Sequence, residues 1–481
     1  MIETPGFKRQ IFKTVLLALA SLAVGAAFIS RQSFWMDEGG PAFKSLMPTL
    51  KDWWFMSMRL GGSDPQMPVY MFLLWIWEKF GATSEYAMRA VNLPWLVLTV
   101  LALKRVRFWP LVCLTSPFVL YYVGELRPYA MQIAAGAMAA AALIKVGSRS
   151  DENGFNGLHL TAGASLLLSC SSLTGAVWAL GLWVGVLILK PKWICQGGFW
   201  SQIIPWALGA LVIGAYYGFT LLQGFRAAGM QSSSILSVFF GFYEMIGLLG
   251  WGPGKNELRD SLKSTVPFLP LLVPAFICIF GAWLAGILGW VKQSSTRTII
   301  GVTCAVLLPV IILSAIGLAM NFRVLGRHLS PAIPAVLLPI ALSLAGSGRW
   351  KTPGRVVSVL AICMSLVSAI TLRISERHAR DDFHTASTLA LDALERHKSV
   401  WWQADMNCMR YYAYLKGGMP LVLAVQHLES DPPANLLMAD YVIINRPDLR
   451  YRGADYQKEL LQNSYKQTHR FTGFEVWTTG F

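Results

Sequence analysis

The sequence predicts a polytopic α-helical membrane protein that ends in a small α/β domain. Hydrophobic residues make up 54% of the 481 positions, and charged residues only 14%, whereas soluble domains carry about 25% charged residues. Apolar runs of membrane-spanning length alternate with short basic clusters over residues 1–371. From residue 372 to residue 481 charges become frequent and short β-like runs appear, which indicates a separate domain.

The membrane part begins with an apolar run at residues 11–30. Lys8, Arg9 and Lys13 precede it, as in a signal peptide, but more apolar runs follow and we expect an uncleaved first helix. A helix needs about 20 residues to cross the hydrocarbon core. About eleven spans are predicted by this criterion, at residues 11–30, 88–104, 108–124, 128–145, 157–174, 175–189, 200–222, 267–290, 297–320, 329–347 and 354–371.

A further apolar run, residues 67–77 (MPVYMFLLWIW), is followed at once by Glu78 and Lys79. It is too short to span a bilayer, so we expect a horizontal helix lying in the interface within the first outer loop. The positive-inside rule supports this interpretation, because counting the run as a span would place every short basic cluster outside. With a horizontal helix, the cytoplasmic clusters are Lys104/Arg105/Arg107, Lys145/Arg149, Lys190/Lys192, Lys292/Arg297 and Arg349/Lys351/Arg355.

This topology predicts a multi-pass protein of a bacterial inner membrane, with residues 372–481 outside the cytoplasm. It also accounts for most of the net charge of +15, so nucleic acid is not an expected partner. Most of the seven cysteines lie in apolar runs without a CxxC pair, which predicts neither a disulfide framework nor a cysteine zinc site. In the C-terminal domain we expect strands at 399–403, 441–445 and 474–478 and helices at 383–396 and 455–465.

Two adjacent acids, Asp37 and Glu38, stand about seven residues beyond the first predicted helix. A carboxylate at a membrane rim is suited to general-base work, because partial desolvation favours its protonated form and a lipid substrate is close at hand. The alternative is a structural pair in the first turn of a helix, where acids are favoured.

Glu125 and Arg127 lie at the outer end of a predicted span, in Tyr121–Tyr129 (YYVGELRPY). Ionisable residues at this depth are costly and are usually paired or functional. A simple Glu125–Arg127 surface pair is the alternative.

Basic residues also occur on the predicted outer side, where the positive-inside rule does not explain them. Guanidinium groups match phosphate oxygens, which makes a lipid-phosphate head group a candidate ligand; snorkelling toward anionic lipid is the alternative. His378 and His384, with Asp381 and Asp382, form a weaker candidate for a metal site. The simpler interpretation is that these residues are solvated because the C-terminal domain begins here. The outer basic residues are Arg89, Arg323, Arg327 and His328, with Lys255 and Arg259 in the 223–266 loop.

Several motifs, in this order and spacing, resemble those of the GT-C glycosyltransferases, specifically the protein O-mannosyltransferase and aminoarabinose lipid A transferase group. The resemblance covers about residues 1–345 and is densest in the first 150. The motifs are Trp35-Met-Asp37-Glu38, Asp64-Pro-Gln-Met-Pro68-Val-Tyr70, Phe80-Gly81 to Arg89, Ser116-Pro117 to Tyr129, Phe242-Tyr243-Glu244 to Gly252-Pro-Gly254, and Gly326-Arg327-His328 to Pro334.

The resemblance implies an inverting transfer of a hexose or pentose from a polyprenyl-phosphate-sugar to an envelope lipid, glycan or protein at the outer face of the membrane. Asp37 corresponds to the acceptor-activating base, with Glu38 and Glu125 as further acids of the site. Arg89, and with it Arg127, Arg327 and His328, are expected to meet the donor phosphate. The sequence departs from the family at Asp64-Pro65-Gln66, where His-Pro-Pro is common, and at Glu125, where some relatives have Asp.

No cofactor is required by the sequence. A divalent metal is compatible with the family but is not assigned to any residue. Two other classes remain open: an O-antigen or polysaccharide polymerase or ligase, which uses a lipid-diphosphate substrate, and a secondary transporter. A transporter would place its ionisable residues near mid-membrane, whereas here they cluster at the predicted outer rim.

Overall fold

The structure, a computed structural model, describes residues 5–148, 156–196, 198–224, 235–254, 257–258, 261–320, 322–346, 351–417, 419, 426–427, 439–446 and 456–479. Four of the basic residues named above, Arg149, Lys255, Arg259 and Arg349, lie outside these residues. The chain forms two compact units. The membrane unit comprises Met1–Ile29, Leu60–Leu73 and Arg89–His378, and the C-terminal unit comprises Ser30–Arg59, Leu74–Met88 and Ala379–Phe481.

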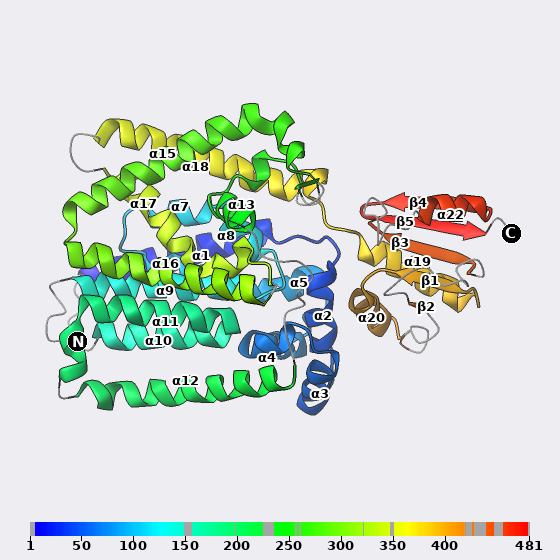
Figure 1. The fold of residues 1–481 in the computed structure, drawn as a ribbon, viewed down its shortest axis with the longest axis horizontal. Helices are drawn as coiled ribbons and strands as arrows, with labels where there is room; N and C mark the ends of the chain where they lie inside the picture. The colour runs from blue at the N-terminus through cyan, green and yellow to red at the C-terminus, as the bar shows by residue number, and fades with distance from the viewer. Residues whose placement is uncertain are drawn as a thin grey trace. The chain divides into compact units, whose positions relative to one another are not determined.

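The membrane unit is mainly helical, with a helix at each of the eleven predicted spans (Figure 1). Among the described residues, seven helical segments are long and apolar enough to cross a membrane: Arg9–Phe28, Tyr129–Gly147, Phe199–Leu222, Lys263–Gln293, Thr296–Ala319, Gly326–Ala345 and Thr352–Ile374. The apolar helices α10 (Asn156–Ser171) and α11 (Leu173–Leu189) are shorter. The helical membrane fold is therefore confirmed, and the count of eleven spans stays a prediction.

Two predicted spans are divided into shorter helices, and in each of them a proline lies at the start of a new helix. The 88–104 segment becomes η2 (Ala90–Asn92) and α6 (Leu93–Ala102), with Pro94 in the first turn of α6. The 108–124 segment becomes α7 (Trp109–Leu114) and α8 (Pro117–Val123). Because proline has no N–H and fixes φ, it is favoured in the first turn of a helix, which is where Pro94 and Pro117 lie.

The other long helices of the membrane unit match their predicted spans to within about six residues at each end, and short helices that were not predicted lie between them. Their bounds are α1 (Pro5–Phe28), α9 (Tyr129–Gly147), η4 (Pro191–Cys195), α12 (Phe199–Leu222), α13 (Ile235–Met245), η5 (Leu249–Trp251), η6 (Leu262–Phe268), α15 (Leu269–Gln293), α16 (Thr296–Ala319), η7 (Gly326–Ala332), α17 (Ile333–Ala345), α18 (Lys351–Ile374) and η8 (Glu376–His378).

Small residues allow these helices to approach closely. A Cβ at Gly136 of α9 would lie 2.2 Å from the carbonyl oxygen of Pro331, and one at Gly286 of α15 would lie 1.8 Å from that of Pro339. A Cβ at Gly185 of α11 would lie 2.5 Å from the carbonyl oxygen of Gly301 in α16. Because lipid supplies little hydrophobic drive between helices, such close packing is a main source of their association.

The loop predicted to lie outside, residues 31–87, contains helices as well. It contains α2 (Met36–Ser45), α3 (Leu50–Leu60), η1 (Asp64–Gln66), α4 (Pro68–Lys79) and α5 (Glu85–Arg89). The predicted short helix at 67–77 is thus present as α4, and its horizontal placement stays a prediction.

The C-terminal unit carries a five-stranded mixed sheet in the order β2-β1-β3-β5-β4 (Figure 1). β1 pairs in parallel with β2 and β3, whereas β5 pairs antiparallel with β3 and β4. Trp401, Val442, Ile444 and Trp477 lie in its core. The elements are α19 (Phe383–Glu395), β1 (Val400–Gln403), α20 (Met406–Leu415), β2 (Gln426–His427), β3 (Tyr441–Asn445), α22 (Tyr456–Gln462), β4 (Tyr465–Phe471) and β5 (Phe474–Thr479).

The predicted strands at 399–403, 441–445 and 474–478 are confirmed, as is the helix at 383–396. The helix predicted at 455–465 ends earlier, at Gln462, and β4 begins at Tyr465. Strand β4 was not predicted from hydropathy, because it lies at the edge of the sheet and five of its seven residues are exposed.

Candidate active site

In the membrane unit, the turn between α8 and α9 carries Glu125 and Arg127. Ser116 caps α8 by accepting a hydrogen bond from the backbone N–H of Val119, and Pro117 begins the helix. Asn92 clamps the turn, since its amide donates to the carbonyl oxygens of Val123 (3.2 Å) and Glu125. Tyr70 fixes the amide in turn, as its hydroxyl donates to Asn92 Oδ1 at 3.2 Å.

Arg127 forms a buried ion pair with Asp64. Its Nη1 lies 2.7 Å from Asp64 Oδ1, its Nη2 donates to Ser63 Oγ at 2.9 Å, and both charged side chains are less than 10% exposed. From the sequence, Asp64 stood out only as a departure from a family motif. In this fold it is the carboxylate that holds Arg127, so the alternative of a local Glu125–Arg127 surface pair is not needed to explain the arginine.

A second polar group surrounds the hydroxyl of Tyr122 on α8. Tyr122 interacts electrostatically with Glu244, Glu125 and Arg327. Glu125 and Glu244 are 1% and 6% exposed, and the carboxylate of Glu244 lies against Gly326, where a Cβ would approach it to 2.5 Å. The membrane unit therefore brings Glu125 and Arg327, two predicted site residues that are far apart in the sequence, into one buried polar group.

His328 follows Arg327 on η7, and its ring is fixed by its neighbours. Its Nδ1 accepts a hydrogen bond from the backbone N–H of Leu325 at 3.0 Å, and Phe322 packs against the ring at 4.8 Å between centroids. Because Nδ1 acts as an acceptor here, the proton of the neutral ring belongs on Nε2. His328 thus presents one N–H donor.

The helix η7 is attached to α9 through Gln132. The hydroxyl of Ser330 donates to Gln132 Oε1, and the Gln132 amide donates to Ser172 Oγ at 2.7 Å. Trp178 Nε1 donates to the carbonyl oxygen of His328 at 3.1 Å. These bonds fix Arg327 and His328 relative to the α8–α9 turn, because Gln132 lies one helical turn beyond it.

Arg89 is the last residue of α5 and is completely buried, at 0% exposed. Arg323 is half-buried in the segment before η7. A fully buried arginine at the end of a helix is expected to be paired or to bind a ligand. The reason is that an isolated buried charge costs roughly 5 kcal/mol or more in desolvation free energy.

In the C-terminal unit, Asp37 and Glu38 lie in the first turn of α2. Glu38 is completely buried; its Oε2 accepts from the backbone N–H of Trp35 at 3.4 Å and forms an ion pair with Arg380. Favourable interaction with the helix dipole adds to this placement. The structural alternative for the acidic pair therefore describes Glu38 well, whereas Asp37 beside it is half-buried.

Asp37 faces a second carboxylate, Asp405, across the same unit. Asp405 caps α20 by accepting from the N–H groups of Asn407 (2.9 Å) and Cys408 (3.1 Å). Burial raises the pKa of Asp405 above its ordinary value, the two capping bonds oppose this, and the charge of Asp37 raises it further. Two neighbouring carboxylates disfavour each other's ionised form.

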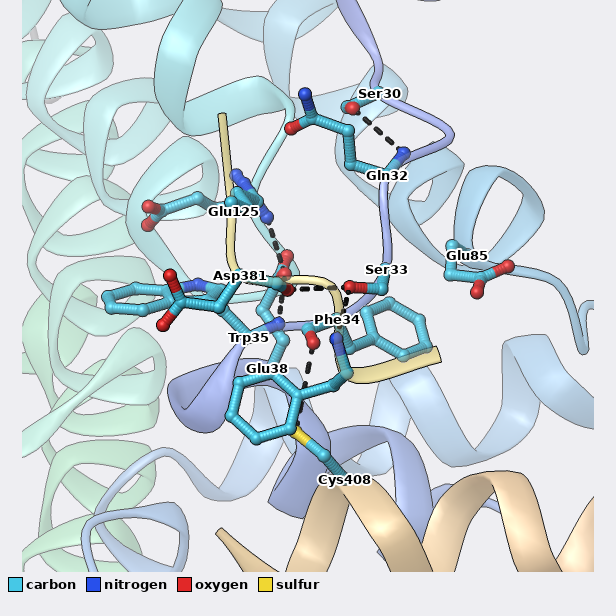
Figure 2. A network of polar contacts seen from close by, with 12 residues as sticks. Ser30, Gln32, Ser33, Phe34, Trp35, Glu38, Glu85, Glu125, Asp381 and Cys408 are labelled. Carbon is cyan, nitrogen blue, oxygen red and sulfur yellow. Dashed lines mark hydrogen bonds and ion pairs between the residues drawn. The ribbon is translucent and has the colours of Figure 1, made fainter. Parts of the chain in front are cut away.

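The segment before Asp37 is bound to residues of the C-terminal domain (Figure 2). Ser33 Oγ donates to the carbonyl oxygen of Asp381 at 2.7 Å and accepts from the N–H of Phe383 at 3.0 Å. The N–H of Phe34 donates to the hydroxyl of Tyr412 at 3.1 Å. A Cβ at Gly39 would lie 2.7 Å from the backbone nitrogen of Cys408, so α2 packs directly on the start of α20.

Glu85, His384 and Tyr412 form a network behind this segment. Tyr412 donates to Glu85 Oε1 at 3.0 Å, and His384 Nδ1 lies 3.4 Å from the same oxygen while its ring stacks on Tyr412 at 4.7 Å. Hydrogen bonding to Glu85 raises the pKa of His384. Burial favours a higher pKa for Glu85, but hydrogen bonds, the largest from His384, outweigh it and lower that pKa.

Three of these residues were missed from the sequence: Arg380, Asp405 and Tyr412. Arg380 and Asp405 belong to no motif in the sequence. The frequent charges near residue 380 indicated only that a separate domain begins there. His384 was considered with His378, Asp381 and Asp382 as a metal site. Among the described residues, no group of three or more His, Cys, Asp or Glu side chains is arranged to hold a metal ion.

Comparison with known proteins gives a match at the level of fold. No protein-family model and no curated protein match the sequence. The chain is similar to the crystal structure of ArnT from Cupriavidus metallidurans in the apo state, with a TM-score of 0.55, 12% identity and 98% of each chain covered. It is also similar to the same protein bound to undecaprenyl phosphate, with a TM-score of 0.51, 13% identity and 97% of each chain covered.

A third solved structure, arabinofuranosyltransferase AftD from Mycobacteria, matches with a TM-score of 0.49 and 12% identity, over 97% of this chain and 40% of that one. The neighbours are GT-C glycosyltransferases. The GT-C fold predicted from the sequence motifs is thus confirmed by the two ArnT structures, over nearly the whole chain.

Proposed function

We propose that this protein is an inverting glycosyltransferase that moves a hexose or pentose from a polyprenyl-phosphate-sugar to an envelope acceptor. The active site and the domain at 372–481 would lie on the extracytoplasmic side of a bacterial inner membrane. The likeness to a protein solved with undecaprenyl phosphate bound supports a polyprenyl-phosphate donor. The order of the sequence motifs supports the same reaction class.

Asp37 is the proposed general base, and the arrangement of α2 is the observation that carries this assignment. Of the two adjacent acids, Glu38 is buried and bound to Arg380, whereas Asp37 is half-buried in the same helical turn. Asp37 would take the proton of the acceptor hydroxyl or amine while that atom bonds to the anomeric carbon. The bond from this carbon to the phosphate oxygen breaks, and its electron pair leaves with the phosphate.

One base suffices for this reaction because the leaving phosphate is already a stable anion and needs little proton donation. Glycosidases, by contrast, divide the work between two carboxylates because their leaving group is a poor one. Glu38 would then orient Asp37 through the first turn of α2. Glu125 would act on the sugar or on the position of its neighbours.

The donor phosphate is assigned to Arg89, Arg127, Arg327 and His328. Arginine is suited to this role because its fork of donors matches phosphate oxygens, and its attraction to them strengthens as charge grows on the leaving group. Arg327, Glu125 and Glu244 all act electrostatically on Tyr122, while His328 offers its Nε2–H. The ion pair with Asp64 would fix the orientation of the Arg127 guanidinium group toward the phosphate.

The test measures turnover of synthetic polyprenyl-phosphate-sugars by the purified full-length protein in nanodiscs, with an envelope extract as acceptor. Release of polyprenyl phosphate, followed by mass spectrometry, reports the reaction whichever molecule of the extract accepts the sugar. Asp37→Asn is expected to lower turnover by about 10²- to 10⁴-fold, the usual contribution of a general base.

Asp52→Asn is the matched control, because Asp52 is an exposed acid of the same loop that bonds to Thr49. Full activity of Asp37→Asn with a normal unfolding temperature would remove Asp37 from the mechanism. Turnover only with a lipid-diphosphate donor would instead indicate a polymerase or ligase. Movement of an intact substrate without cleavage of the sugar–phosphate bond would indicate a transporter.

A further inference from the structure

The membrane unit contains a large cavity that the proposed reaction does not use. It has a volume of about 450 Å³ and lies among α9, α11, α15, α16 and α17. Gly136 and Pro331 line one end, and Ser148 and Thr298 line the other. None of the proposed site residues lines it.

The cavity is long and apolar. From Gly136 to Ser148 it follows twelve residues of α9, or about 18 Å at the rise of a helix, a length that suits an alkyl chain. Its walls are mainly Ala, Leu, Ile and Val side chains, including Ala139, Ala335 and Leu342. Water is not expected to fill such a space, because it offers too few polar partners.

Basic residues from four separate segments stand close in the sequence to residues that line one end of this cavity. Val106, Ser148, Trp290 and Thr298 line that end. Arg105 and Arg107 flank Val106 in the sequence, Lys145 precedes Ser148 by three residues, Lys292 follows Trp290 by two, and Arg297 precedes Thr298. Arg105, Arg107, Lys292 and Arg297 are exposed, and Lys145 is half-buried. The nearest acids along the chain, Asp151 and Glu152, lie outside the described residues.

We propose that this cavity binds an anionic phospholipid, with one acyl chain between the helices and the phosphate head group at the basic end. The apolar length requires a chain, which excludes free phosphate as the natural occupant. The positive charge of the rim selects a net negative head group over a zwitterionic one, because each Lys or Arg near an anionic lipid contributes about 1 kcal/mol, or about fivefold in affinity. The bound lipid would fill a space among five helices that no side chain fills.

This site is separate from the proposed active site, which involves the opposite end of α9. Gly136 at the far end of the cavity lies on the same helix as Gln132, which holds η7. The lipid would therefore stabilise the helices that position Arg327 without touching a reacting group. The proposal does not depend on which reaction the protein performs.

The experiment is native mass spectrometry of the purified full-length protein, titrated in micelles with phosphatidylglycerol, phosphatidylcholine or undecaprenyl phosphate. We expect phosphatidylglycerol to bind at least tenfold more tightly than phosphatidylcholine. The double variant Arg107→Gln/Arg297→Gln is expected to weaken phosphatidylglycerol binding by about 30-fold, the combined effect of two charges. Ala335→Phe, which fills the cavity, is expected to abolish one equivalent of bound lipid.

Matched controls keep the result specific. Lys190→Gln/Lys192→Gln removes two charges from another basic cluster, and Ala210→Phe adds the same side chain to an exposed position of α12; neither change is expected to alter binding. Equal affinity for phosphatidylglycerol and phosphatidylcholine by the wild-type protein overturns the proposal, whatever the variants do. Displacement of phosphatidylglycerol by an equimolar amount of undecaprenyl phosphate also overturns it, because the cavity would then belong to the donor.

Discussion

Among the described residues, each unit of the molecule contains a buried pair of an acid and an arginine, Asp64–Arg127 and Glu38–Arg380, and these two pairs differ in how they are assembled. In the membrane unit, Asp64 and Arg127 are 63 residues apart, and each belongs to a motif that the sequence already marked. In the C-terminal unit, Glu38 and Arg380 are 342 residues apart, and Arg380 belongs to none. The first pair joins two outer turns of one helical bundle. The second joins the first outer loop to the start of the C-terminal domain.

This difference indicates what the C-terminal domain does for the loop that carries Asp37. Each of four residues of this loop has a contact with a residue beyond 379: Ser33, Phe34, Glu38 and Gly39. A buried ion pair adds little to net stability, because desolvation offsets the attraction, but it penalises every arrangement in which one partner is left alone. We therefore interpret Arg380 as the residue that specifies how α2 packs within its unit.

The largest expected effect is at this pair. Arg380→Met would leave the carboxylate of Glu38 buried without its charge partner, which is expected to cost about 3–5 kcal/mol of unfolding free energy. The double variant Glu38→Gln/Arg380→Met should recover most of that loss, because the buried charge is removed as well. Thermal unfolding of the purified protein, with limited proteolysis of the 30–59 segment, measures both.

Arg127→Met in the membrane unit is the matched change. Its cost is expected to be smaller, because the side chain of Asp64 is 9% exposed and that of Glu38 is 0% exposed. An equal loss of unfolding free energy in Arg380→Met and Arg127→Met would contradict the expected difference between the two pairs. No recovery in the Glu38→Gln/Arg380→Met variant would show that Arg380 acts through packing and not through its charge.

A smaller effect is expected where glycine permits a close approach in each unit. Gly39→Ala would bring a Cβ to 2.7 Å from the backbone nitrogen of Cys408, and Gly136→Ala would bring one to 2.2 Å from the Pro331 carbonyl oxygen. Backbone cannot yield as a side chain does, so each change is expected to cost about 1–3 kcal/mol. Gly147→Ala, on the same helix as Gly136 but with open space around it, is the control.

The two glycine variants separate the units functionally. Gly39→Ala should lower turnover through Asp37, whereas Gly136→Ala should weaken donor binding by displacing η7 with Arg327. Measured kcat and KM for the donor distinguish the two results. A stability of Gly136→Ala equal to that of Gly147→Ala would show that η7 moves away from α9 without cost.

Hydropathy and charge predicted most of the fold, because each membrane helix carries its own apolar signal. The broken segments around Pro94 and Pro117 were not foreseen, although proline in the first turn is the reason for both. The edge strand β4 was missed because its residues face solvent. Predicted strands at 399–403, 441–445 and 474–478 were found because they are buried and rich in β-branched or aromatic residues.

The sequence identified the residues of the candidate site but not the residues that they contact. Asp37, Glu38, Glu125, Arg89, Arg127, Arg327 and His328 were chosen for their charge and their place at the ends of spans, and their catalytic roles stay predictions. No local pattern reveals that Glu38 meets Arg380 or that Arg127 meets Asp64, because such contacts depend on tertiary packing. Asp405 was not predicted for the same reason, because a capping acid at the start of a helix does not reveal what lies near it in the fold.

The smallest expected effect is a pH dependence that belongs to the C-terminal unit alone. The raised pKa of His384 stabilises the folded state below about pH 6.5, its ordinary value, and this contribution is lost as the pH rises through the folded pKa. The lowered pKa of Glu85 stabilises the folded state above about pH 4.5, and this contribution is lost as the pH falls through the folded pKa. Both contributions are present together only between these two limits.

His384→Gln should therefore lower the unfolding temperature most between about pH 4.5 and 6.5 and least at pH 8 and above. The difference is expected to stay below about 1 kcal/mol, because the side chain of His384 is 57% exposed and water screens the pair. The charge of Asp382 raises the pKa of His384 and that of Lys416 lowers it, so Lys416→Gln should move the loss of this contribution to a higher pH. His469→Gln on the exposed strand β4 should show no such window, and a pH-independent loss in His384→Gln would assign its role to stacking on Tyr412 instead.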